Sequence, residues 1–356
     1  MTLRTVRRLA AAAAAVVLVA TGCTDDGDET PAGTTATTGD TSPTTVGPTG
    51  APTTDSPEAT STASSVATTG PRSDTGDESA DELAGAGLGD PPARVDVALD
   101  ATELADQLSA SHATIVDPTA SVDEREDAGT AYQLLLRELA GRPELDEEVL
   151  AGLDPAARPA VERIVRARQF LQARSESRPP QPPPDELPAW TIAEPEPIET
   201  LLGHYAEAEQ LTGVGWNWLA AIHLQETRMG RIQGVSSAGA VGPMQFLPTT
   251  WATCCTGDPT VTRDAIIGAA TYLAQSGGPD DMAAALYQYN PNDGYVAVVT
   301  AYAESLRDEP ELYSGYHAFQ VFFGSSAGTV RLPIGYSLTS PIDAAAYLES
   351  NPQDAA

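Results

Sequence analysis

The stretch that decides the fold lies at residues 223–251, which read HLQETRMGRIQGVSSAGAVGPMQFLPTTW. It continues an almost wholly apolar run that begins at Trp216, and Glu226 lies near the end of that run. The run predicts a buried helix over residues 216–229, closed by Gly230. Burial raises the pKa of a carboxyl group, so a buried Glu226 is able to donate a proton near neutral pH. The alternative is an ordinary solvated glutamate at a helix end.

Two further blocks follow Glu226 in a fixed order. Residues 238–251 comprise a glycine-rich loop and the start of a predicted helix at Pro248. Residues 284–290 read AALYQYN, followed by Tyr295 and Val296. Together the three blocks resemble the signature of peptidoglycan lytic transglycosylases, both the membrane-bound B-like and the soluble-like kinds. The resemblance covers residues 197–307, about a third of the chain.

The resemblance implies a mainly α-helical, lysozyme-like catalytic domain and a non-hydrolytic reaction. Glu226 would act as the single acid and base that cleaves the β-1,4 bond between N-acetylmuramic acid and N-acetylglucosamine, leaving a 1,6-anhydro-muramoyl product. No water is consumed, so the second carboxylate of ordinary glycosidases is not required. Two alternatives remain open: a hydrolysing muramidase, and a non-catalytic peptidoglycan-binding scaffold lipoprotein.

The resemblance also implies which residues contact the glycan. Gln245 would bind sugar hydroxyls and acetamides, since an amide both donates and accepts hydrogen bonds, or it holds loop backbone instead. The hydroxyl of Tyr289 would orient the acid, or the ring is a half-buried helix-end tyrosine. The remaining candidates, each with a structural alternative, are Ser236 (or its neighbour Ser237), Gly242, Met244 and Asn290.

The composition argues against several other kinds of protein. The four histidines are scattered, and neither a His-Glu-x-x-His nor a Cys-x-x-Cys motif occurs, so we expect no metal and no cofactor. We interpret His223 as a core histidine. The sequence contains no lysine, which disfavours nucleic-acid binding through a basic patch. The formal net charge of −31 comes in part from the acidic segment at residues 23–92 and does not indicate the charge of a substrate. Cys254 and Cys255 are adjacent, and either a bond between them or two free thiols fits the sequence.

The amino terminus predicts a lipoprotein. Residues 1–22 have the arginines, short apolar core and small residues of a signal peptide, followed directly by Cys23, the expected lipidation site. Residues 23–92 are rich in Thr, Ser, Pro and Asp, with thirteen carboxylates and one arginine after Cys23, and we expect a disordered tether. The predicted location is the extracytoplasmic face of the cell membrane, with glycan strands as the partner; division or wall proteins are not identifiable from the sequence.

The remaining segments are assigned by pattern. Residues 93–178 predict a helical region of unknown role, and residues 179–196 a proline-rich connector. Within 197–307 we expect helices over 263–275, capped by Thr262, over 281–289, capped by Asp280, and over 294–306. Residues 308–356 form a carboxyl-terminal extension in which Phe319–Phe323 and Gly328–Leu332 predict a β-hairpin.

Overall fold

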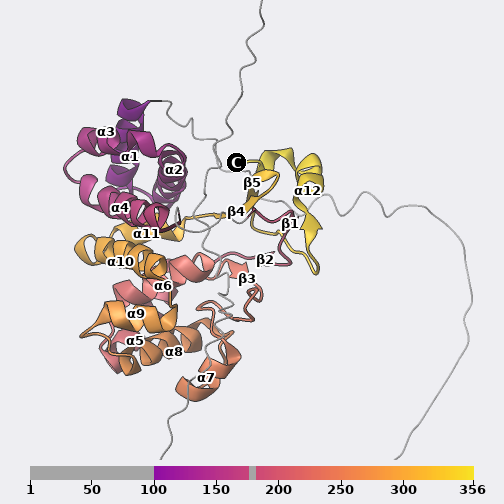
Figure 1. Cartoon of the computed structure of the whole chain (residues 1–356). Helices are drawn as coiled ribbons and strands as arrows, with labels where there is room; N and C mark the ends of the chain where they lie inside the picture. The colour runs from indigo at the N-terminus through magenta and orange to yellow at the C-terminus, as the bar shows by residue number, and fades with distance from the viewer. Residues whose placement is uncertain (1–99, 176–181) are drawn as a thin grey trace, which may run out of the picture. The chain divides into compact units, whose positions relative to one another are not determined.

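A computed structural model describes residues 100–175 and 182–356 (Figure 1). The expectations for the signal peptide, Cys23 and the acidic tether therefore lie outside the described residues. Within them the chain is mainly α-helical, as predicted, with twelve α-helices and three short two-stranded sheets.

The first group of helices comprises α1 (Ala101–Val116), α2 (Val122–Gly141), α3 (Asp146–Gly152) and α4 (Arg158–Ser175), with a 3-10 turn at Pro143–Leu145. Two of them begin at strong sequence signals. Asp100 accepts a hydrogen bond from the Glu103 amide, and Ser121 forms a reciprocal capping box with Glu124. Each cap satisfies amide groups that the first turn of a helix leaves without partners.

The second group carries the blocks around Glu226. It comprises α5 (Ile198–Thr212), α6 (Trp216–Thr227), α7 (Pro248–Cys254), α8 (Thr262–Gln275), α9 (Met282–Tyr289), α10 (Asp293–Asp308) and α11 (Leu312–His317). A disulfide joins Cys254 to Cys255 at the end of α7.

Six short strands among the described residues form three antiparallel pairs. The hairpin of β4 (Val321–Ser325) and β5 (Gly328–Leu332) confirms the prediction from sequence. The predicted proline-rich connector contributes two short strands: β1 (Glu186–Leu187) pairs with β6 (Ile342–Asp343), and β2 (Thr191–Ile192) pairs with β3 (Ile232–Gln233). Helix α12 (Ala344–Ser350) and a 3-10 turn at Pro352–Asp354 follow.

Both groups of helices share one hydrophobic core. It runs without interruption from Leu104 and Leu135 to Leu219, Ala269 and Tyr316. Helix α10 is the common element, because it packs against both α4 and α6 (Figure 1). A separate small cluster, which includes Leu187, Trp190 and Val330, forms the core beneath the strands.

Candidate functional site

Glu226 lies near the end of α6, a helix that is buried on nearly every side. Helix α6 packs against α5, α8 and α10. Its apolar residues are therefore buried in the core, and its carboxyl-terminal end is held in place. The Glu226 side chain keeps only partial exposure. Burial raises the pKa of Glu226 to about 7, opposed by the Tyr295 hydroxyl and by the positive charge of Arg228. This carboxyl group is therefore partly protonated near neutral pH.

The end of α6 departs from the prediction. The helix stops at Thr227 rather than Met229, because Arg228 and Met229 both adopt left-handed backbone conformations ahead of Gly230. The Thr227 hydroxyl donates to the Pro243 carbonyl at 2.6 Å and accepts from the Gly230 amide at 3.0 Å. These two bonds tie the helix end that carries Glu226 to the glycine-rich loop.

The loop is folded tightly at Gly242. This residue has φ +76°, and a Cβ added there would lie 1.8 Å from the Pro259 carbonyl oxygen, so only glycine fits. Val241 and Phe246 pair across the turn through two backbone hydrogen bonds of 2.9 Å. The Gln245 side-chain amide donates to the Gly242 carbonyl at 2.9 Å, and Gln245 itself has φ +50°. Its side-chain nitrogen therefore holds loop backbone, one of the two roles considered from the sequence.

Two tyrosines stand beside Glu226. The rings of Tyr289, at the end of α9, and Tyr295, in α10, are stacked with centroids 6.4 Å apart. Burial raises the pKa of both hydroxyls, and the neighbouring charge of Glu226 raises them further. The Tyr289 hydroxyl donates to the Met244 carbonyl at 2.5 Å, whereas the buried Tyr295 hydroxyl makes no hydrogen bond of standard geometry within the described residues. Tyr295 is nevertheless close enough to the Glu226 carboxyl for its hydroxyl to lower the pKa of that group.

The remaining candidate residues lie in the core, at the start of the loop and at the end of α9. Met244 is fully buried and its side chain belongs to the core, while its carbonyl accepts a hydrogen bond from Tyr289. The Ser236 hydroxyl accepts from the Ala240 amide and closes a turn at the start of the loop. Asn290 follows α9 as its C-cap, with its amide bonded to the Leu286 carbonyl.

His223 is a core residue, as interpreted. It is fully buried and shares a 2.8 Å hydrogen bond with the Tyr205 hydroxyl. Burial lowers its pKa to about 3, so its imidazole is neutral. Its hydrogen bond to Tyr205 therefore joins α6 to α5 inside the core.

Tyr295 was not among the site residues predicted from sequence. The signal was present, because Tyr295-Val296 belongs to the third block. What the sequence could not show is that the first turn of α10 faces the end of α6, a relation that depends on how the two helices pack.

Comparison with known proteins supports a distant relationship over part of the chain. A stretch of 128 residues, 34% of the chain, is 29% identical to the membrane-bound lytic murein transglycosylase F of Thiobacillus denitrificans. The chain covers 27% of the length of that relative. No protein-family model and no solved structure matches the chain. The chain thus has distant partial homology to a lytic transglycosylase.

Proposed function

We propose that this protein is a lytic transglycosylase that cleaves the β-1,4 bond between N-acetylmuramic acid and N-acetylglucosamine in peptidoglycan. The observation that carries the proposal is the partly buried Glu226, whose pKa of about 7 suits a group that must both donate and accept a proton. The partial homology to a lytic murein transglycosylase supports the same reaction class.

In the proposed reaction Glu226 acts twice. Its protonated carboxyl group donates to the glycosidic oxygen as the bond to C1 of muramic acid breaks. The resulting carboxylate then accepts the proton of the muramoyl O6 hydroxyl, whose oxygen attacks C1 and closes the 1,6-anhydro ring. Glu226 ends protonated, as it began, and no water enters.

The surroundings of Glu226 favour this route over hydrolysis. The groups that oppose the effect of burial on its pKa are a tyrosine hydroxyl and a guanidinium, Tyr295 and Arg228, and both stabilise the carboxylate that forms midway. Within the described part of the chain, none of the groups that shift this pKa is a carboxylate. A hydrolysing glycosidase normally uses a second carboxylate, to activate water or to act as the nucleophile.

We further propose that the loop after α6 contacts the glycan. The Gln245 carbonyl oxygen makes no hydrogen bond within the described residues and remains able to accept from a sugar hydroxyl or acetamide. Ser236 retains its hydroxyl proton for donation, and the tight turn at Gly242 lets the backbone approach the sugar. Tyr289 would act through Met244, by holding the loop against α9, and Asn290 would line the end of the same helix.

The test is the chemistry of the products. Full-length wild type and Glu226→Gln would be incubated with purified peptidoglycan, and the released muropeptides analysed by mass spectrometry. We expect anhydro-muramoyl ends from wild type and an activity at least about 10²-fold lower from the variant. Reducing ends would instead identify a hydrolysing muramidase, and an absence of products from wild type would indicate a binding protein.

We propose that Cys23 carries the lipid that anchors the protein to the outer face of the cell membrane. Within residues 100–175 and 182–356 no helix is long and apolar enough to cross a bilayer. Cys23→Ala should move the protein from the membrane fraction to the soluble fraction. Unchanged membrane association of the variant would contradict the anchor.

A further inference from the structure

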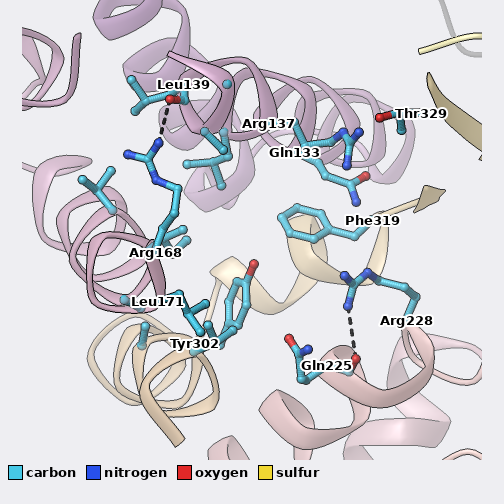
Figure 2. A pocket seen from close by; sticks show the side chains of 18 residues that line it. Gln133, Arg137, Leu139, Arg168, Leu171, Gln225, Arg228, Tyr302, Phe319 and Thr329 are labelled. Carbon is cyan, nitrogen blue, oxygen red and sulfur yellow. Dashed lines mark hydrogen bonds between the residues drawn. The ribbon is translucent and has the colours of Figure 1, made fainter. Parts of the chain in front are cut away.

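A hollow lies where the two groups of helices meet. It has a volume of about 160 Å³ and is formed by α2, α4, the end of α6 and α10, with Phe319 and Thr329 closing one side (Figure 2). Neither Glu226 nor the glycine-rich loop lines it. Several of the lining side chains, among them Leu136, Ile164 and Tyr302, keep partial exposure, so the pocket is accessible from solvent.

The body of the pocket is apolar and small. Its apolar lining consists mainly of Leu136, Ile164, Val165, Leu171, Val298 and Phe319. A cavity of about 150 Å³ with this kind of lining accommodates a single benzene molecule. The pocket therefore fits one small apolar group and is too small for a disaccharide.

Two guanidinium groups face this pocket without a close ion pair to any described carboxylate. Arg137 projects from α2, and Arg228 follows α6 on the opposite side (Figure 2). Among the described residues neither forms an ion pair. Arg137 is held by stacking, with its guanidinium carbon 4.0 Å from the centre of the Phe322 ring, and Arg228 donates to the Leu224 carbonyl at 2.5 Å. Each guanidinium has five N–H donors, so both keep donors for a ligand.

Arg168 also lines this pocket, but unlike Arg137 and Arg228 it forms a close ion pair. Its guanidinium forms a buried ion pair with Asp146 and donates to the Leu139 carbonyl at 2.8 Å. Among the described residues, Arg168 thus has a carboxylate in direct contact, Arg228 has only the more distant charge of Glu226, and Arg137 forms no ion pair. Burial, together with the like charge of Arg228, lowers the pKa of Arg137 to about 10. Two like charges in a partly buried pocket are stabilised by a bound anion.

The pocket is also close to the proposed catalytic residue. Arg228 is two residues after Glu226, and its charge acts on the pKa of Glu226. In peptidoglycan, muramic acid carries a stem peptide that ends in a carboxylate. An extended peptide of three to five residues reaches about 10–18 Å, so a sugar at Glu226 could place its stem peptide at Arg228.

We propose that this pocket binds the terminal carboxylate of a short peptide that ends in a small apolar residue, such as the alanine of a stem peptide. The carboxylate lies between Arg137 and Arg228, and the methyl group enters the apolar body. The identification of the peptide as the substrate's stem rests on the proposed function; the binding of an alanine carboxylate does not.

The first experiment measures binding alone. Nα-acetyl-D-alanyl-D-alanine and its carboxyl-terminal amide would be titrated calorimetrically into the full-length protein. We expect the acid to bind at least about tenfold more tightly than the amide, and Arg137→Gln to remove that difference. Arg158→Gln, an exposed arginine at the start of α4, is the matched control and should retain it. Equal binding of acid and amide by wild type, or no binding of either, would overturn the proposal whether or not Arg137→Gln folds.

The second experiment separates the pocket from the reaction. Cleavage of peptide-bearing glycan strands would be compared with cleavage of strands stripped of their peptides. We expect wild type to prefer the peptide-bearing strands through a lower KM, and Arg137→Gln to lose about tenfold in kcat/KM on these strands only. Equal losses on both substrates would refute a peptide site. If wild type cleaves neither, the proposed function is wrong, and the acid-versus-amide titration alone decides the pocket.

Discussion

The raised pKa of Glu226 predicts that this residue destabilises the fold above neutral pH. Its pKa rises from 4.5 to about 7, a change of about 2.5 units. At about 1.36 kcal/mol per unit this corresponds to about 3.4 kcal/mol. Because the side chain is partly exposed, solvent screening reduces the effect, and we expect about 2 kcal/mol.

The direction follows from proton linkage. The folded state binds the Glu226 proton more tightly than the unfolded state, so well below pH 4.5 the carboxyl group is neutral in both and has no effect on stability. The penalty grows as the pH rises from 4.5 to about 7 and is complete above that range. Glu226→Gln, which is neutral at every pH, should therefore gain stability relative to wild type as the pH increases.

Urea denaturation of both proteins at about pH 5 and about pH 8.5 would measure this gain. The difference in unfolding free energy should increase by about 2 kcal/mol between the two pH values, while effects of other titrating groups cancel. Glu349→Gln, at an exposed position of α12, controls for the loss of one charge. A difference that is independent of pH, or that shrinks as the pH rises, would refute the burial argument.

Three further predictions concern the same site. The value of kcat/KM should fall as the pH rises through about 7, because Glu226 must begin protonated; an increase over that range in a pH–rate profile would contradict its role as the acid. Tyr289→Phe leaves the Met244 carbonyl without its donor, so we expect a loss of about 1–3 kcal/mol in urea denaturation together with a lower kcat. Gly242→Ala forces a Cβ against the Pro259 carbonyl and should lower Tm far more than Gly239→Ala, which has a similar φ of +83° but open space around it; equal Tm values would show that the close approach is not required.

The sequence predicted the helices well wherever an apolar face or a cap defined them. The predicted helix at 263–275 is observed as Thr262–Gln275, and that at 281–289 as Met282–Tyr289. The errors lie at the ends of the helices, where neighbouring residues can each serve as the cap. Asp281 rather than Asp280 caps α9, by accepting from the Ala284 amide, and Thr262 is the first residue of α8 rather than its cap.

The candidate site was predicted in part. Glu226 stood out because a carboxylate in an apolar helix has few structural uses, and the block around Gly242 stood out by its residue pattern. The approach of Tyr295 to Glu226 and that of Arg137 to Arg228 were not predictable. Both depend on packing between helices that are far apart in sequence, and no local pattern encodes such contacts.

Because the core is shared, α1 to α4 stay packed against the helices around Glu226. Gln133 in α2 exchanges two hydrogen bonds with the backbone of Gln320, of 2.9 and 2.7 Å, and Ala167 in α4 packs against Val298 and Ala301 in α10. Proteolytic cleavage in the proline-rich segment between α4 and β1 would therefore yield two fragments that remain associated. For the same reason a homologue that lost residues 100–175 would have to cover the exposed face of α10 with new side chains or with a separate protein.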